Sequence, residues 1–294
     1  MEPELIRLHS GALTLLSFIF GVVFGSFLNV IIARLPKKLE NQWRRESLDY
    51  LQLSDTDIAE EEMGISYPKS HCPNCKTILK WWQNIPLISF FLLRGRCSTC
   101  KKEISLLYPI IEFFAGLITI LSTTKFGLSS TTIYALIFSY SLLALIAIDA
   151  GHKILPDIIT IPLLWMGLFV NSQDHFTNLH SAVLGALLGY LFLWTVFQMF
   201  RLVTGKHGLG YGDFKLLAAI GAWLGWQLLP ITLVLSSLTA LITGFIALSF
   251  KLMKKEDPIP FGAFISAVGL ILLYAEPGDA FFGLVFGEII NKNN

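Results

Sequence analysis

The sequence predicts an all-α polytopic membrane protein with about eight transmembrane helices and a small cytoplasmic insert that binds zinc. Composition is the first reason: 54% of the residues are hydrophobic, only 15% are charged, and the mean hydropathy is +0.63. These values lie outside the range of soluble globular domains. The second reason is a series of long apolar segments, and the third is a set of four cysteines in two CxxC pairs within a polar stretch.

The apolar segments account for most of the chain. A helix needs about 20 apolar residues to cross the roughly 30 Å of a hydrocarbon core. Eight segments approach that length: 11–33, 105–123, 131–148, 157–172, 180–203, 213–229, 230–250 and 260–275. The fourth and the eighth are short, and only Leu229-Pro230 separates the sixth from the seventh. The first is longer than the apolar region of a signal peptide and has no small-residue cleavage site after it, so we expect it to be retained.

Basic residues in the loops predict the orientation of the chain. Lys and Arg are enriched in cytoplasmic loops. If the polar insert is cytoplasmic, the loops 149–156, 201–212 and 251–259 lie on its side and are basic, whereas the loops on the other side contain only Lys125. This pattern places the N-terminus outside the cytoplasm and the insert inside it.

Charged residues are concentrated in one part of the chain. Residues 34–103 contain 12 of the 22 Lys and Arg and 9 of the 21 Asp and Glu. We therefore divide the chain into a first transmembrane helix (1–33), a cytoplasmic insert (34–103) and a transmembrane core (104–294). An acidic run at 55–62 is interpreted as a solvated surface, with attraction of a basic peptide as the alternative. We find no internal repeat.

The four cysteines are Cys72, Cys75, Cys97 and Cys100, and 21 residues separate the two CxxC pairs. In a secreted domain such residues could form disulfides, but this spacing is typical of a zinc site in a reducing compartment. Two loops that each supply two thiolates form a closed tetrahedral site without an open coordination position. We expect zinc with a structural role.

Two aspartates lie at the edges of apolar segments. Asp149 ends the third segment, and Asp213 begins the sixth, directly after Gly208, Gly210 and Gly212. An ionisable group at membrane depth is a candidate functional site, and two carboxylates that share a proton can hydrolyse a peptide bond with water. We expect the glycines to allow close approach of a substrate backbone and positive φ. The alternatives are a helix cap for Asp213 and a simple loop-edge carboxylate for Asp149.

Other polar residues also lie within or beside these segments. Asp157 follows Leu155-Pro156 and is interpreted as a helix cap. Glu112 lies within the second segment, where it either contacts a basic or hydroxyl partner or borders a cofactor pocket. His152 and His207 are interpreted as surface residues of the loops.

Many short motifs occur together in an order that is typical of one family. They are Gly25-Ser26-Phe27-Leu28-Asn29-Val30, Arg34-Leu35-Pro36, the two CxxC pairs, Asn84-Ile85-Pro86-Leu87-Ile88-Ser89, Arg94-Gly95-Arg96-Cys97, Tyr108-Pro109 with Glu112, Ile148-Asp149, Leu155-Pro156-Asp157 and Gly208-Leu209-Gly210-Tyr211-Gly212-Asp213-Phe214-Lys215. With these motifs the chain resembles the bacterial type IV prepilin peptidases, which are GxGD-type aspartyl proteases of the inner membrane, over nearly its whole length.

The resemblance implies a membrane aspartic endopeptidase with N-methyltransferase activity, in which Asp149 and Asp213 are the catalytic pair. It implies substrates that are type IV prepilins or pseudopilins of pilus assembly or type II secretion, each with a short basic leader that is cleaved at the cytoplasmic membrane face. The new N-terminal residue would then be methylated with S-adenosylmethionine, and Gly95 in the insert is implied in that activity. The lipid bilayer is an expected partner, and nucleic acid is not.

Two other classes of function remain as alternatives. One is a non-enzymatic zinc-containing scaffold of a secretion or pilus machine, and the other is a transporter whose two aspartates carry protons. The chain contains no Rossmann-type GxGxxG motif, so the residues themselves do not place a site for S-adenosylmethionine.

Overall fold

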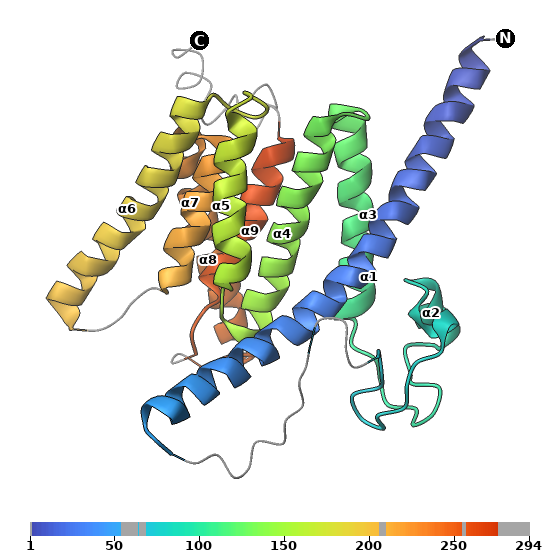
Figure 1. Cartoon of the computed structure of the whole chain (residues 1–294), viewed down its shortest axis with the longest axis horizontal. Coiled ribbons are helices and arrows are strands. Elements are labelled where there is room, and N and C mark those ends of the chain that lie inside the picture. Colours follow the sequence, from blue (N-terminus) through green and yellow to red (C-terminus); the bar gives the residue numbers. More distant parts are fainter. Residues whose placement is uncertain (1, 54–63, 65–68, 206–209, 255–256, 276–294) are drawn as a thin grey trace. The chain divides into compact units, whose positions relative to one another are not determined.

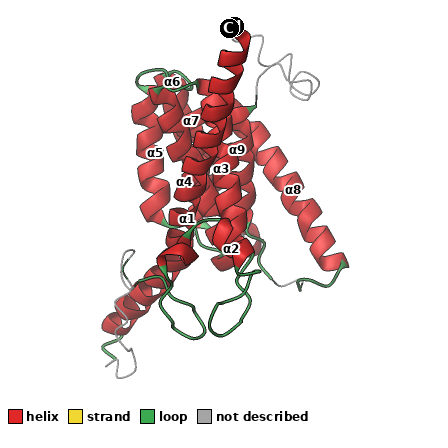
Figure 2. Ribbon diagram, turned by 90° about the vertical axis from the view of Figure 1, so that its right-hand side faces the viewer, coloured by secondary structure: helices red, strands yellow, loops and turns green. Residues whose placement is uncertain are grey.

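The computed structural model describes residues 2–53, 64, 69–205, 210–254 and 257–275, and for residues 2–10 it describes the backbone alone. Within these ranges the chain is helical, with two isolated β-bridges and no strand (Figure 2). The chain forms two units, Met1–Leu128 and Ser129–Asn294. The predicted acidic run at 55–62 lies outside the described residues.

The described part of the first unit contains two long helices and two short ones: α1 (Glu2–Tyr50), the 3-10 helix η1 (Trp81–Asn84), α2 (Ile88–Leu92) and α3 (Leu107–Phe126). Small residues bring α1 and α3 close together. A Cβ atom on Gly25 of α1 would lie 2.7 Å from the Cα atom of Glu112, and one on Gly116 of α3 would lie 2.9 Å from Val22. The missing side chains let the two backbones approach as in tightly packed membrane helices.

Helix α1 continues well beyond the predicted end of the first span at residue 33. It includes Pro36 and runs to Tyr50. Proline removes one backbone donor and disturbs the preceding turn, but a long helix can continue past it with a kink. The helix therefore joins the first span to the start of the polar insert, and the three-part division of the chain stays a prediction.

The described residues of the second unit form six α-helices that pack against one another (Figure 1). They are α4 (Ser130–His152), α5 (Asp157–Asn171), α6 (Leu179–Thr204), α7 (Tyr211–Leu224), α8 (Leu229–Ser249) and α9 (Phe261–Tyr274), and the 3-10 helix η2 (Trp226–Leu228) links α7 to α8. Side chains cap two of them: Ser129 accepts a hydrogen bond from the Thr132 N–H, and Asn178 accepts one from the Ser181 N–H. These caps set where α4 and α6 begin.

Helix α7 is the centre of the second unit, because every residue from Asp213 to Leu224 except Lys215 is buried. It packs against α5, α6 and α9. Gly185 of α6 lies directly against Gly221 of α7. Two residues further along α7, the Trp223 indole N–H donates to the Leu163 carbonyl at 2.8 Å, and the Trp223 ring stacks on Phe138 with centroids 4.8 Å apart. Small residues on one side and aromatic residues on the other fix this helix in place.

The helices confirm the predicted all-α membrane class. Each of the eight apolar segments overlaps one helix, namely α1 and α3 to α9. Five helices among the described residues are long and apolar enough to cross a membrane: α1, α3, α4, α6 and the η2–α8 segment. Helices α5 and α9 are shorter apolar helices, and α7 has 14 residues. The exact number of crossings stays a prediction.

Candidate active site and cysteine cluster

Asp149 lies in the last turn of α4 and is 5% exposed. Its Oδ2 atom accepts a hydrogen bond from the backbone N–H of Ala263 at 2.7 Å. Ala263 belongs to the first turn of α9, where backbone N–H groups have no partner within the helix. The residue before α9 is Pro260, which provides no side-chain cap. The carboxylate of Asp149 therefore caps α9 from another helix, which is more than a loop-edge carboxylate would do.

Asp213 lies in the first turn of α7 and is 7% exposed. Its Oδ2 atom accepts a hydrogen bond from the backbone N–H of Gly210 at 3.3 Å. Asp213 therefore makes the helix-capping interaction that the sequence analysis gave as its alternative role. It does not separate this carboxyl from the other one, because the start of α7 and the start of α9, which Asp149 caps, both contact Leu155. The fold brings together the two aspartates that lie 64 positions apart in the sequence.

The turn after α4 and the start of α9 account for this arrangement. Asp149 ends α4, whereas Asp213 begins α7 and Ala263 begins α9. Because α9 packs against both α4 and α7, the end of α4 and the starts of the two other helices come together. Two helix N-termini then direct N–H groups toward the two carboxylates, an arrangement that favours negative charge at this place.

The side chain of Leu155 occupies the space beside two glycines at these helix starts. A Cβ atom on Gly212 of α7 would lie 2.8 Å from Leu155 Cβ, and one on Gly262 of α9 would lie 2.6 Å from Leu155 Cδ1. Leu155 in the α4–α5 link therefore packs against both helix starts. Close approach of a substrate backbone at these glycines stays a prediction, and the prediction of positive φ is wrong for Gly210 and Gly212. Both have ordinary negative φ because they belong to the cap and first turn of a helix; Gly208 lies outside the described residues.

Asp157 and Lys215 form an ion pair beside the aspartates. The Lys215 Nζ atom lies 2.8 and 2.7 Å from the two carboxylate oxygens of Asp157. The interpretation of Asp157 as a helix cap is wrong: α5 begins at Asp157 itself, the cap position is Pro156, and no side-chain cap is present. The ion pair instead joins the first turn of α5 to the second turn of α7, so it positions the helix that carries Asp213.

Glu112 is buried in α3 and contacts groups from α1 and from the insert. Its Oε2 atom accepts a hydrogen bond from the Leu87 N–H at 2.8 Å, and the side chains of Ser26 and Asn29 also interact with it. The expected hydroxyl partner is therefore present, together with a backbone amide that the sequence did not reveal. Leu87 has a positive φ of 56°, so the buried carboxylate holds a strained residue next to α2.

The two cysteine pairs lie in loops of the same backbone form. In each loop the N–H of the residue after the second cysteine donates to the carbonyl of the first: Lys76 to Cys72 at 3.0 Å and Lys101 to Cys97 at 3.1 Å. Both lysines have positive φ, and a β-bridge closes each loop: His71 with Ile78, and Arg96 with Glu103. This structural repeat is hidden in the sequence because the two loops share only the cysteines and one lysine.

The four sulfur atoms fit a zinc ion. All four lie within 4.8 Å of one another, with Cys72 Sγ 3.8 Å from Cys100 Sγ and Cys75 Sγ 3.9 Å from Cys97 Sγ. Tetrahedral zinc with thiolate bonds of about 2.3 Å places its sulfurs about 3.8 Å apart, whereas a disulfide needs about 2.05 Å. The cysteines are free. The cluster is therefore compatible with zinc, and disulfide pairing does not fit it.

Hydrogen bonds prepare two of the thiols for metal binding. The Thr77 hydroxyl lies 3.3 Å from Cys75 Sγ, and this side chain together with the Thr77 backbone lowers the pKa of Cys75 to about 6. Backbone N–H groups of Cys100 and Thr99 lower the pKa of Cys97. Thiolates are the metal-binding form of cysteine, so these bonds favour a metal site.

Gly95 lies in the turn between α2 and the second cysteine loop. Its φ is +66°, and a Cβ atom on it would lie 3.1 Å from the Phe90 ring. A pocket of about 560 Å³ next to this turn is lined by Leu92, Leu93, Arg94, Arg96, Cys97, Ser98 and Lys101. S-adenosylmethionine carries a sulfonium and an ammonium against one carboxylate, so it is a net cation. The three basic side chains, with no acidic side chain among the lining residues, do not fit it.

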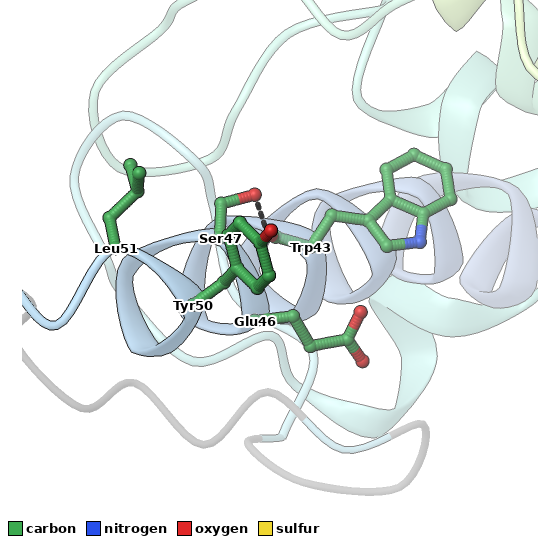
Figure 3. Close-up of a pocket in the computed structure, with 5 residues that line it drawn as sticks. All are labelled: Trp43, Glu46, Ser47, Tyr50 and Leu51. Atoms are coloured by element: carbon green, nitrogen blue, oxygen red, sulfur yellow. Dashed lines mark hydrogen bonds between the residues drawn. The ribbon is translucent and has the colours of Figure 1, made fainter.

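A second pocket lies on the last turns of α1 and contains none of the predicted site residues. It is open to solvent and is lined by Trp43, Glu46, Ser47, Tyr50 and Leu51 (Figure 3). The Ser47 hydroxyl donates to the Trp43 carbonyl at 2.7 Å within the same helix. Because all five residues come from one helix end, this pocket is a surface feature and not a candidate active site.

Comparison with known proteins identifies the family. A model described as the bacterial peptidase A24 N-terminal domain matches residues 19–126, and the type IV leader peptidase family matches residues 136–245. The chain is 43% identical over 274 residues to the prepilin leader peptidase/N-methyltransferase of Stutzerimonas stutzeri, covering 93% of this chain and 94% of that protein. The protein of the same name from Pseudomonas aeruginosa is 43% identical over 265 residues, covering 90% and 91%.

The chain belongs to the type IV leader peptidase family. The resemblance that the sequence motifs indicated is therefore confirmed. Within this family match, the peptidase region at 136–245 includes Asp149 and Asp213, and the N-terminal region at 19–126 includes the four cysteines. Ala263, which holds Asp149, lies outside both matched regions. No solved structure matches the chain.

Proposed function

We propose that the chain cleaves the leader peptide of type IV prepilins or pseudopilins and then methylates the new N-terminal residue, with Asp149 and Asp213 as the catalytic pair. The observation that carries the proposal is the pair itself. Two buried carboxylates, from the end of α4 and the start of α7, each accept a hydrogen bond from a backbone N–H group at a helix start, and Leu155 packs against both of these helix starts. The names of the relatives support the choice of substrate.

The arrangement supports an aspartic-protease mechanism. The N–H groups at the starts of α7 and α9 favour negative charge, whereas mutual repulsion opposes ionisation of both carboxyls, so the pair holds one proton between two groups. The ionised carboxylate takes a proton from a water molecule while the oxygen of that water attacks the scissile carbonyl carbon. The protonated carboxyl donates to the carbonyl oxygen. The C–N bond then breaks as the proton removed from water passes to the leaving amine, and one hydroxyl of the tetrahedral intermediate returns a proton to the carboxylate that acted as the acid.

Charges near the aspartates support a cytoplasmic active site in the bacterial inner membrane. Lys153 follows Asp149 at the end of α4, Lys215 lies near the start of α7, and Arg201 lies in the last turn of α6. Basic residues at one end of membrane helices favour the cytoplasmic side. A basic leader that stays in the cytoplasm, followed by an apolar helix in the bilayer, would present its scissile bond at this level.

The methyl group in the second reaction comes from S-adenosylmethionine. The resemblance to the family associates methylation with the insert and with Gly95, but the basic pocket beside Gly95 does not fit the cofactor. We therefore propose that Gly95 acts by shaping the turn after α2, whose positive φ only glycine adopts without strain. The four cysteines fit zinc, which would stabilise the insert without taking part in either reaction, because a closed site has no open coordination position.

Mass spectrometry of the N-terminus of a co-expressed prepilin tests the proposal. The chain should yield a shortened and methylated product. Asp149→Asn or Asp213→Asn should each lower cleavage by at least about 10²–10⁴-fold, the usual contribution of a general acid or base. Asp174→Asn is the matched control: Asp174 lies in the turn after α5 with a φ of +53°, which asparagine tolerates.

Each alternative function gives another result. Full-length prepilin in every sample, with the chain present in the membrane, would overturn the peptidase and favour a scaffold. Cleavage that persists in both aspartate variants, together with loss of a proton-dependent flux, would favour a transporter.

A further inference from the structure

The insert exposes apolar side chains on its two short helices. Trp81 in η1 is 80% exposed, and in α2 Ile88, Phe91 and Leu92 are 57%, 72% and 69% exposed. The two helices pack against each other. We call these four residues the α2 surface. Exposed aromatic and aliphatic residues grouped in this way mark an interaction site.

Glu112 fixes the level of the α2 surface relative to the membrane. The hydrogen bond from the Leu87 N–H to Glu112 holds the residue directly before α2. Glu112 lies five residues after Leu107, the first residue of α3, which is about 7.5 Å along the helix axis. Helix α2 therefore begins beside the first turns of an apolar helix long enough to cross a membrane. Leu106 and Leu107, at the start of α3, are also exposed, by 64% and 41%.

The charge around the α2 surface is strongly positive. Residues 69–103 contain seven Lys and Arg and a single acidic residue, Glu103. Three of the basic residues, Arg94, Arg96 and Lys101, line the pocket of about 560 Å³. Leu92, the last residue of α2, and Leu93, which follows it, line the same pocket. The pocket thus joins an apolar side, continuous with the α2 surface, to a cationic rim.

We propose that the α2 surface inserts into the headgroup region of the membrane and that the adjoining basic pocket binds the phosphate of an anionic lipid. Apolar residues with Lys and Arg beside them are typical of surfaces that bind anionic lipid interfaces. The lipid phosphate is complementary to Arg94, Arg96 and Lys101. A basic prepilin leader and the cationic methyl donor carry the wrong charge for this pocket.

Fluorescence quenching by brominated lipids tests the contact in the full chain. The chain is placed in nanodiscs of phosphatidylcholine with or without phosphatidylglycerol, with plain or brominated acyl chains. The emission of Trp81 is obtained as the difference between the unchanged chain and Trp81→Phe. We expect brominated lipid to quench this emission, and we expect stronger quenching when phosphatidylglycerol is present.

Matched variants separate the lipid contact from the fold of the insert. Phe91→Glu with Leu92→Glu should remove the quenching, whereas Ile78→Glu should keep it, because Ile78 is 61% exposed but lies in the first cysteine loop. Arg94→Gln with Lys101→Gln should remove the extra effect of phosphatidylglycerol. Metal content is measured in each variant, and one zinc per chain shows that the cysteine loops are intact.

Four results would overturn the proposal. The first is equal Trp81 emission in plain and brominated lipid, and the second is unchanged quenching in the Phe91→Glu, Leu92→Glu variant with its zinc retained. The third is a change of Trp81 emission only when prepilin is added, which would make the α2 surface a protein-docking site. The fourth is a basic-pocket variant that loses binding of S-adenosylmethionine but keeps its response to phosphatidylglycerol.

Discussion

The Oδ2 atom of Asp149 accepts a hydrogen bond of 2.7 Å from the backbone N–H of Ala263, 114 positions later in the sequence. The bond joins the end of α4 to the start of α9. It gives the carboxylate a fixed orientation, and it satisfies an amide that has no partner within its own helix. The position of one aspartate of the pair therefore depends on how closely α9 approaches α4. Helix α9 lies outside the region that the peptidase family matches.

Adding a methyl group at Gly262 should disturb the aspartate pair. A Cβ atom there would lie 2.6 Å from Leu155 Cδ1, so Gly262→Ala should shift α9 away from Asp149 and cost about 1–3 kcal/mol of stability, as overpacking does. We expect slower prepilin cleavage and a lower melting temperature in detergent. Leu155→Ala in the same chain should restore part of both.

Gly151→Ala provides the control for this substitution. Gly151 also lies near Asp149 in α4, but a Cβ atom there would have no heavy atom within 4 Å. Equal losses in Gly151→Ala and Gly262→Ala, or no rescue by Leu155→Ala, would contradict the packing argument.

The ion pair between Lys215 and Asp157 should affect cleavage more than stability. Its side chains are 31% and 54% exposed, and exposed pairs contribute at most about 1 kcal/mol. Lys215 follows Asp213 by two positions in α7, so Asp157→Ala should slow cleavage while the melting temperature changes little. The reversed pair, Asp157→Lys with Lys215→Asp, should regain activity.

The control for the ion pair is the exposed contact between Arg96 and Glu103 in the insert, where the charged atoms are 3.9 Å apart. Glu103→Ala should leave cleavage unchanged. A reversed pair that is as slow as Asp157→Ala would show that the attraction between the two charges is not what positions α7.

Zinc retention should depend on Thr77 when the pH is lowered. The Thr77 side chain and backbone lower the pKa of Cys75 to about 6, so protons displace the metal from this thiolate only at acidic pH. Thr77→Val removes the hydroxyl and should raise the pKa of Cys75, so zinc should be released at a higher pH. A metal-sensitive dye records the release as the pH is lowered from about 8 to about 5.

Thr99→Val tests whether the effect is specific to the hydroxyl beside Cys75. Thr99 lies in the second cysteine loop and acts on Cys97 through its backbone, so its side chain should not change zinc release. Identical release curves for the chain and for Thr77→Val would rule out the proposed role of the hydroxyl.

Glu112 should be replaceable by glutamine but not by alanine. Glutamine retains an oxygen that can accept the Leu87 N–H, whereas alanine leaves a buried donor unsatisfied, at a cost of about 1–3 kcal/mol. Hydrogen exchange should therefore become faster around α2 in Glu112→Ala and stay slow in Glu112→Gln. Equal exchange in the two variants would show that the hydrogen bond does not hold the insert.

Local features of the sequence were sufficient for the class of the protein and for most of its candidate site. Long apolar segments predict membrane helices because an unpaired backbone cannot remain in hydrocarbon. The spacing of the four cysteines predicts the cluster that the structure confirms, because each loop positions its two thiols by itself. The two aspartates could be predicted as site residues because an ionisable carboxyl at membrane depth is costly and marks a functional site.

Other features were decided only by the tertiary structure. The Asp149–Ala263 and Asp157–Lys215 contacts, and the packing of Leu155 against Gly212 and Gly262, join residues far apart in the chain. Helix periodicity does not show which helix ends meet. The predictions of a helix cap at Asp157 and of positive φ at Gly210 and Gly212 are wrong for this reason. Each of these groups takes its role from a neighbour that only the packing of helices brings into contact.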